Sequence, residues 1–222
     1  MSITSNLTYI RNQIPIGVKL VCVSKFHPDE ALMEAYRVGE RVFGESKVQE
    51  MTGKYERLPK DIEWHFIGHL QSNKVKYIIP YVNLIHGVDS EKLVAEIDRQ
   101  AAKIGRKVNC LLQVHIASEE TKFGFDEIEL IQFFENGGLE RYSNLQICGL
   151  MGMATFTDDK NQVQCEFMHL KSIFDRLKNR FLSQNSEFKE LSMGMSDDFP
   201  IAIACGSTMV RIGSSIFGTR QY

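Results

Sequence analysis

The feature that most constrains the fold is an alternation of short apolar runs with longer amphipathic runs, repeated eight times along the 222 residues. Near-continuous apolar runs joined by helical crossovers are typical of parallel β-strands that are buried on both faces. The predicted strands span residues 19–24, 42–44, 62–67, 84–88, 108–116, 145–151, 190–193 and 209–212. Eight such units favour a closed α/β barrel of the (β/α)8 TIM type over an open doubly wound sheet.

The segments between the predicted strands carry the signals of helices. The predicted helices span residues 28–38, 46–58, 73–79, 90–105, 126–136, 160–181 and 197–204. Ser90 is a suitable N-cap for the fourth of them, and Gly105 ends it. Gly137 and Gly138 are expected to close the fifth. An extra N-terminal helix is expected to pack outside the barrel, and residues 1–222 are expected to form a single domain.

The composition argues against several classes of partner. The 26 basic and 28 acidic residues leave a formal charge of −2, so no nucleic acid is expected to bind through a basic surface. The start, MSITSNLTYI, has no basic n-region and no long apolar run, and is therefore not a secretory signal. No stretch approaches the roughly 20 apolar residues of a membrane span.

The five cysteines and six histidines lack the spacing of a disulfide framework or a metal site. Cys22, Cys110 and Cys148 fall inside predicted strands, where a free cysteine behaves as a small apolar residue. An odd number of scattered cysteines is more typical of a protein in a reducing cytosol than of a disulfide framework. His65 and His69 are four residues apart, but a glycine and β-forming neighbours argue against a shared helix. The cysteine pattern therefore predicts a cytoplasmic protein, and the histidine spacing predicts no metal site. Because no exposed apolar heptad is evident, we expect a monomer.

Lys25 directly follows the first predicted strand, in VCVSKFHPDE. Barrels of this type build their site at the C-terminal ends of the strands, so this position matters. One interpretation is a solvated charge at a strand end, and the other is an amine held at the mouth of the barrel. Lysine amines form Schiff bases with carbonyl compounds when burial or nearby cations depress their pKa.

The loops after the seventh and eighth strands, SMGMSDD and GSSIFG, are rich in glycine and serine. Small residues let backbone N–H groups approach an anion, and loops at these positions often bind phosphate. The alternative is that the glycines only serve tight turns. A phosphorylated aldehyde would satisfy both these loops and Lys25, and two such molecules are pyridoxal phosphate and the phosphorylated sugar of a Schiff-base aldolase.

Arg211 lies on the eighth predicted strand, two residues before Gly213. A guanidinium facing a pyridine nitrogen keeps that nitrogen unprotonated, which makes the ring a weaker electron sink. Arg211 therefore helps to separate pyridoxal phosphate from a sugar phosphate. The alternative interpretation is a structural salt bridge.

Five motifs, in order, resemble the pyridoxal-phosphate homeostasis protein family: CVSKFHP, FGESKVQE, WHFIGHLQSNK, LSMGMSDDFPIAI and GSTMVRIGSSIFG. They span Val21 to Gly218. The resemblance implies a fold like the barrel domain of alanine racemase, with pyridoxal 5′-phosphate held on Lys25 as an internal aldimine. It places the arginine that faces the ring nitrogen at Arg211. The phosphate-binding positions implied by the resemblance are Ser192, Gly213 and Ser214, with Met193 and Ser196 as further candidates.

Three positions leave questions open. Ser46 stands in FGES where the family often has asparagine, so a contact between Ser46 and the cofactor is uncertain. Ser214 replaces a frequent threonine and keeps the hydroxyl group. Lys122, in the loop SEETKFGF, is a candidate to hold the phosphate or a second cofactor molecule, against the simpler interpretation of a solvated lysine.

Racemases of the related fold need a second acid/base group opposite the lysine, and the resemblance implies a tyrosine from a separate β-domain. That domain is expected to be absent here. The internal tyrosines are expected on helices or loops: Tyr36, Tyr55, Tyr77, Tyr81 and Tyr142. His69 could lie near the ring but has no evident partner in the sequence.

Three functions remain possible at this point. The first is a carrier that buffers pyridoxal 5′-phosphate on Lys25, takes part in vitamin B6 and amino-acid homeostasis, and releases the cofactor to apo-enzymes or free amino acids. The second is a pyridoxal-phosphate-dependent amino-acid racemase or related lyase, and the third is a Schiff-base sugar-phosphate aldolase. A weak electron sink without a second acid/base group favours the carrier, so no catalytic residue is assigned.

Overall fold

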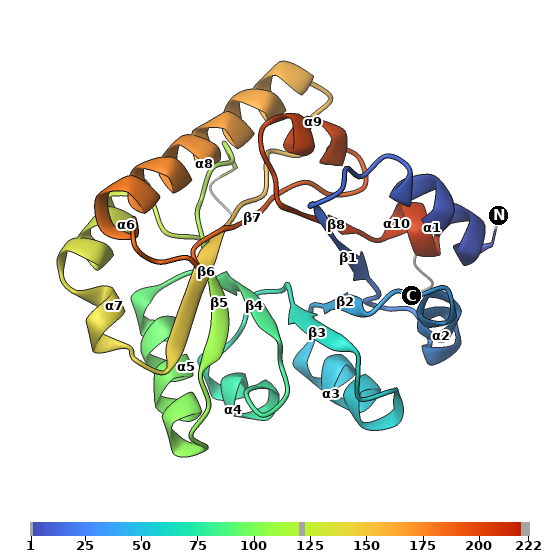
Figure 1. The fold of residues 1–222 in the computed structure, drawn as a ribbon, viewed down its shortest axis with the longest axis horizontal. Coiled ribbons are helices and arrows are strands. Elements are labelled where there is room, and N and C mark those ends of the chain that lie inside the picture. The colour runs from blue at the N-terminus through green and yellow to red at the C-terminus, as the bar shows by residue number, and fades with distance from the viewer. Residues whose placement is uncertain (1, 120–122, 219–222) are drawn as a thin grey trace.

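The computed structural model describes residues 2–119 and 123–218. Eight parallel strands pair in sequence order, and β1 pairs with β8 to close a barrel, which confirms the predicted fold class (Figure 1). The strands are β1 (Lys19–Val23), β2 (Val42–Glu45), β3 (Glu63–Phe66), β4 (Leu84–Val88), β5 (Val108–Gln113), β6 (Leu145–Met151), β7 (Glu190–Ser192) and β8 (Met209–Ile212).

The helices surround the barrel (Figure 1). They are α1 (Ile3–Arg11), α2 (Asp29–Arg37), α3 (Val48–Arg57), the 3₁₀ turn η1 (Ser72–Lys74), α4 (Val75–Ile78), α5 (Glu91–Lys103), α6 (Glu127–Glu135), α7 (Gly138–Arg141), α8 (Lys160–Phe181), α9 (Phe199–Ala204) and α10 (Ser214–Phe217). Ser90 caps α5, as predicted, by accepting a hydrogen bond from the N–H of Leu93. α1 lies against α2 and α10, so the N-terminal helix packs outside the barrel, as predicted.

Three local expectations differ from the structure. The strand expected over 108–116 ends at Gln113, because the N–H of His115 donates to the carbonyl of Phe125 on the returning part of its own loop. Gly137 ends α6 with a φ of 71°, but Gly138 begins the extra helix α7 and does not help to close α6. The short helix α10 after β8 was not expected, because four residues are too few to show a helical period.

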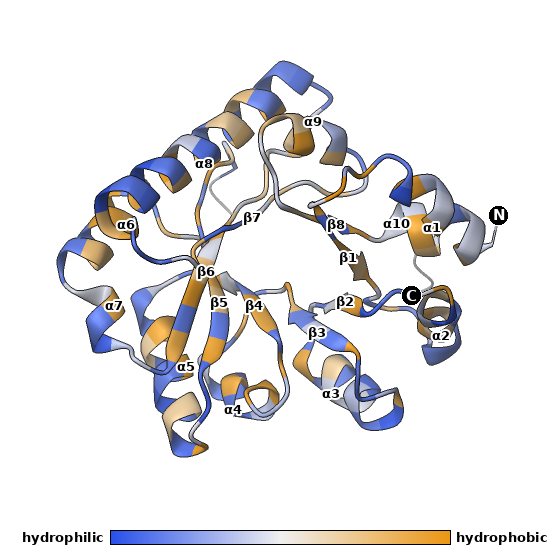
Figure 2. Ribbon diagram, viewed as in Figure 1, coloured by the Kyte–Doolittle hydropathy of each residue, from blue (hydrophilic) through white to orange (hydrophobic). Residues whose placement is uncertain are grey.

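Apolar side chains form two cores on the two sides of the barrel wall. The outer core fills the space between the strands and the helices, whose hydrophobic and hydrophilic residues alternate (Figure 2). The inner core lies inside the barrel and consists of Val21, Leu84, Leu111, Cys148, Met151 and Met209. On β8 the alternation of a strand puts Met209 and Arg211 inside the barrel and Val210 and Ile212 in the outer core.

Cys22, Cys110 and Cys148 are buried in β1, β5 and β6 and are not disulfide-bonded, as the sequence predicted. Burial raises the pKa of the Cys22 and Cys110 thiols well above the ordinary value, so both remain protonated and behave as small apolar groups. No helix in the part of the chain that the structure describes is long and apolar enough to cross a membrane.

Two adjacent residues of α8 test the outer core. Phe167 is 0% exposed and Met168 is 56% exposed. We expect Phe167→Ala to lower the free energy of unfolding by about 3–5 kcal/mol, because it removes buried contacts and leaves a cavity. Met168→Ala should change it by less than about 0.5 kcal/mol. Urea unfolding measures both variants, and equal losses would contradict the assignment of this face to the core.

Candidate functional site

Lys25 lies in a tight turn directly after β1. The N–H of His27 donates to the carbonyl of Ser24 at 3.1 Å, which closes a four-residue turn. Phe26 has a φ of +66°, as at the third position of a type II turn, where glycine is preferred. For phenylalanine this left-handed conformation costs about 1–2 kcal/mol. Lys25 is half-buried. This burial is more typical of an amine held at the mouth of the barrel than of a fully solvated charge.

The closed barrel brings this turn beside the loop that follows β8. β1 and β8 pair in parallel, with Val21 opposite Arg211. A Cβ atom on Gly213 would lie 3.1 Å from the carbonyl oxygen of Val23, so the absence of a side chain lets this loop approach the end of β1 closely. Lys25, Arg211 and Gly213 therefore belong to one arc of the barrel mouth.

The loops after β7 and β8 meet at the same arc. The N–H of Gly213 donates to Ser196 Oγ at 3.4 Å. Within residues 2–119 and 123–218, the N–H groups of Ser214 and Ser215 at the start of α10 have no hydrogen-bond partner. The structure thus brings Ser196, Gly213 and Ser214 together, with backbone and hydroxyl donors suited to an anion.

Arg211 is buried inside the barrel and is held by oxygen atoms. Its Nη1 donates to the carbonyl oxygen of Ser192 at 2.9 Å and to Ser192 Oγ at 2.6 Å, and its Nη2 donates to the carbonyl oxygen of Gly152 at 3.1 Å. Burial lowers the pKa of Arg211 to about 10, so the guanidinium stays charged at neutral pH. Within the described residues Arg211 forms no salt bridge, and the charge of Asp198 acts to raise its pKa against the effect of burial.

A hydrogen-bonded chain continues from Arg211 across the barrel interior. Ser192 Oγ lies 3.1 Å from His86 Nδ1, and His86 Nε2 lies 3.0 Å from His65 Nδ1. Burial lowers the pKa of His65 to about 3 and that of His86 well below its usual value, so both rings are neutral. Because arginine only donates, Ser192 Oγ accepts from Arg211, and the hydroxyl hydrogen of Ser192 is available to His86 Nδ1.

The remaining predicted phosphate residues lie within the barrel wall. Ser192 is fully buried, and its hydroxyl is engaged by Arg211 and His86. Met193 is also fully buried, and its N–H donates to the carbonyl oxygen of Met209 at 3.2 Å. A contact between either residue and a phosphate stays a prediction.

His69 has a partner that was not evident in the sequence. Its Nδ1 lies 2.8 Å from Asp89 Oδ2. The two residues are 20 positions apart and meet because the parallel strands β3 and β4 end at the same rim. The ring of Phe123 also stacks on His69, with the centroids 4.1 Å apart.

Ser46, in the loop after β2, lies beside the loop after β3. A Cβ atom on Gly68 would lie 2.5 Å from the carbonyl oxygen of Ser46, so only glycine fits at that point of the WHFIGHLQSNK motif. Ser46 and His69 line a pocket of about 220 Å³ together with Lys47 and Lys74. Lys122 lies outside the described residues.

A buried charged cluster lies next to the turn of Lys25. Lys54 Nζ lies 2.8 Å from Glu45 Oε1 and 2.7 Å from Glu50 Oε1. The side chains of Glu45 and Lys54 are 0% and 4% exposed. Burial raises the pKa of Glu45 to about 7, although Lys54 acts in the opposite direction. This cluster does not stand out in the sequence, because its members look like ordinary polar residues of a strand end and a helix.

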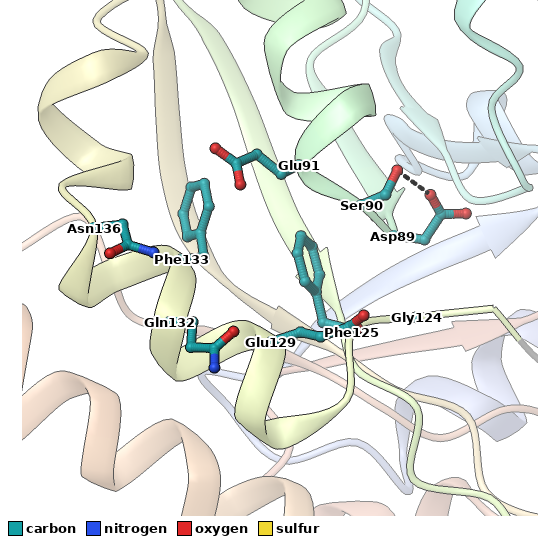
Figure 3. Close-up of a pocket in the computed structure, with 9 residues that line it drawn as sticks. All are labelled: Asp89, Ser90, Glu91, Gly124, Phe125, Glu129, Gln132, Phe133 and Asn136. Carbon is teal, nitrogen blue, oxygen red and sulfur yellow. Dashed lines mark hydrogen bonds between the residues drawn. The ribbon is translucent and has the colours of Figure 1, made fainter.

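A hollow of about 360 Å³ lies between the start of α5 and α6. Figure 3 shows the residues that line it. Glu91 and Glu129 line it, and both carboxylates have partners inside the protein. Glu91 accepts from the hydroxyl of Tyr142, and Glu129 accepts from the N–H of Asp126 in the capping box of α6. None of the predicted site residues that the structure describes lines this hollow, so we do not place the site there.

Comparison with known proteins first defines a class. The family model of the alanine racemase N-terminal domain matches residues 1–221. An alanine racemase of Clostridium difficile has the same fold, with a TM-score of 0.78 at 16% identity over 100% of this chain and 56% of its own. The chain is thus built on the racemase barrel, which confirms the predicted fold class.

More similar relatives define the particular family. A pyridoxal phosphate homeostasis protein of Aquifex aeolicus is 42% identical over 92% of this chain and 88% of its own length. Another, from Haemophilus influenzae, is 36% identical over 100% of this chain and 98% of its own length. PipY of Synechococcus elongatus has been solved with pyridoxal phosphate bound. It is 36% identical over 98% of this chain and 100% of its own, with a TM-score of 0.88. The chain belongs to the pyridoxal phosphate homeostasis protein family.

Glu45 makes stability depend on pH. Its folded pKa of about 7 lies above the ordinary value of 4.5, so the folded state holds this proton more tightly. The resulting stability is complete below pH 4.5 and is lost as the pH rises through about 7. We expect Glu45→Gln to gain on the order of 3 kcal/mol relative to wild type across this range. Urea unfolding at several pH values measures it, and identical pH profiles for wild type and variant would contradict the assignment.

Proposed function

We propose that the chain binds pyridoxal 5′-phosphate and buffers it as a Schiff base on Lys25, within intracellular vitamin B6 and amino-acid homeostasis. The observation that carries this proposal is the pairing of β1 with β8, which sets the turn of Lys25 beside Arg211 and the loop at Gly213. PipY, which is 36% identical, has been solved with pyridoxal phosphate bound, and this supports the same ligand here.

The donors of this arc fit the cofactor. When bound, pyridoxal phosphate supplies an aldehyde carbon that reacts with amines and a pyridine ring that accepts electrons. Arg211 has five N–H groups, and its Nε and one hydrogen of Nη2 have no partner within the described residues, so they can donate to a pyridine nitrogen. The N–H groups of Ser214 and Ser215 and the hydroxyl of Ser196 can donate to a phosphate.

Two observations favour a carrier over an enzyme. A guanidinium at the ring nitrogen leaves the ring unprotonated and weakens it as an electron sink. The five candidate tyrosines lie on the outer helices or directly after them: Tyr36 (α2), Tyr55 (α3), Tyr77 (α4), Tyr81 (after α4) and Tyr142 (after α7). We therefore propose that the chain holds the cofactor and releases it to apo-enzymes or to free amino acids.

The pair of His69 and Asp89 favours the second candidate function, an amino-acid racemase or related lyase. A carboxylate at Nδ1 orients the imidazole and leaves Nε2 as the atom that can accept or give a proton. His69 is half-exposed at the mouth, where an amino acid would approach. A monomeric state, a cytoplasmic location and a single domain over residues 1–222 stay predictions.

Lys25 can be tested by absorbance. We expect wild type mixed with pyridoxal phosphate to develop a yellow absorption band, and borohydride to leave a covalent adduct on the peptide that contains Lys25. Lys25→Arg keeps the positive charge but should give neither, because its guanidinium does not form the Schiff base. Mass spectrometry locates the adduct. An equal band in Lys25→Arg would remove Lys25 from the proposal.

The choice between carrier and enzyme can be tested by proton exchange. A carrier should exchange the α-proton of L-alanine in deuterium oxide no faster than free pyridoxal phosphate does, and His69→Gln should not change that rate. Proton NMR of the alanine α-position measures the exchange. A faster exchange in wild type that is lost in both His69→Gln and Asp89→Asn would favour the racemase or lyase.

A further inference from the structure

The turn of Lys25 is tied on both sides to the charged cluster of Glu45, Glu50 and Lys54. The carbonyl oxygen of Ser24, directly before Lys25, accepts from Lys54 Nζ at 2.9 Å. The hydroxyl of Ser24 donates to Glu45 Oε1 at 2.6 Å. The hydroxyl and the carbonyl oxygen of Ser24 are therefore held by side chains of β2 and α3.

The residue after Lys25 is held by the same cluster. The N–H of Phe26 donates to Glu50 Oε1 at 2.7 Å. Phe26 has the left-handed φ of +66°, which a phenylalanine keeps only when the surroundings impose it. Among the described residues, Glu50 is the acceptor for this N–H, so its carboxylate fixes the strained peptide next to Lys25.

Lys54 completes the arrangement without a spare donor. Its ammonium has three N–H bonds, and Ser24, Glu45 and Glu50 supply three acceptors. One cation thus links the backbone before Lys25 to the carboxylate that holds the backbone after it. The group is only 4% exposed, so water competes little for these bonds.

We propose that Glu50 and Lys54 are positioning residues for Lys25, and that they hold the left-handed turn from which its amine meets the cofactor. This inference rests on the proposed function, in which Lys25 is that amine. The alternative is an ordinary buried ion cluster that only joins α3 to β2. The positioning role and the ordinary ion cluster predict different results for a glycine at position 26. If the cluster acts by holding Phe26 in its left-handed conformation, a glycine there should make the cluster unnecessary for Lys25.

The variants follow from the contacts. Glu50→Ala removes the acceptor of the Phe26 N–H and one partner of Lys54. Glu50→Gln keeps an acceptor oxygen and should be milder. Lys54→Met keeps most of the side-chain volume but removes all three bonds. Phe26→Gly makes the left-handed turn favourable by itself, because glycine adopts positive φ without strain.

The first measurement uses the apo-protein, over its full chain. We expect amide hydrogen exchange at Phe26 to become about tenfold faster in Glu50→Ala, because a hydrogen bond to a charged group is lost. Glu56→Ala, an exposed position on the same helix, is the control and should leave this rate unchanged. Unchanged exchange at Phe26 in Glu50→Ala, or an equal change in the control, would overturn the proposal.

The second measurement adds pyridoxal phosphate and follows borohydride labelling of Lys25. Labelling should be about tenfold slower in Glu50→Ala and Lys54→Met, and should recover in the double variant Phe26→Gly/Glu50→Ala. A loss that glycine does not restore would identify the cluster as structural only. If wild type itself is not labelled at Lys25, the proposed function fails, and the Phe26 exchange rate alone decides whether the cluster holds the turn.

Discussion

The pairing of β1 with β8 is the interaction on which the candidate site depends. It closes the barrel and sets Val21 opposite Arg211, although these two residues are 190 positions apart in the chain. The same closure brings Gly213 against the end of β1, where a Cβ atom would lie only 3.1 Å from the carbonyl oxygen of Val23. An open sheet with the same strands would leave Lys25 and the phosphate-type loops at opposite edges, so closure itself creates the arc that can bind a phosphorylated aldehyde.

The barrel interior shows how a cation can be buried without a carboxylate. Arg211 donates to two carbonyl oxygens and one hydroxyl, and that hydroxyl lies at hydrogen-bond distance from a neutral histidine. A carboxylate here would compensate the charge but would also occupy the N–H groups of Arg211 that have no partner within the described residues. Outside the barrel, Lys54 is satisfied differently, by two carboxylates and a carbonyl, and there the charges hold a backbone turn. The Lys54 network is fully connected at the cation, whereas Arg211 keeps its Nε and one hydrogen of Nη2 without a partner within the described residues.

The sequence predicted the helices and strands that depend on local patterns of residues. The eight strands, the long helix α8 and the capped helix α5 followed from apolar periodicity and from cap residues. The chain of His65, His86 and Ser192 was not predicted, because each residue is a lone polar group inside an apolar strand. Asp89 was missed as the partner of His69 for the same reason, since the two meet only across neighbouring strands. The end of β5 at Gln113 was misjudged because a returning loop takes over its hydrogen bonds.

By itself the sequence determined the type of fold and the residues available for chemistry. Hydrophobic periodicity and Gly/Ser-rich loops are local properties, and they placed Lys25, Arg211 and Gly213 at strand ends or beside them. Only the tertiary structure decided which of these residues meet, which are buried and which hold another in place. Hydrogen bonds between distant residues depend on barrel closure and register, and burial sets the pKa of Glu45, His65 and Arg211 through loss of water, which no spacing along the chain encodes.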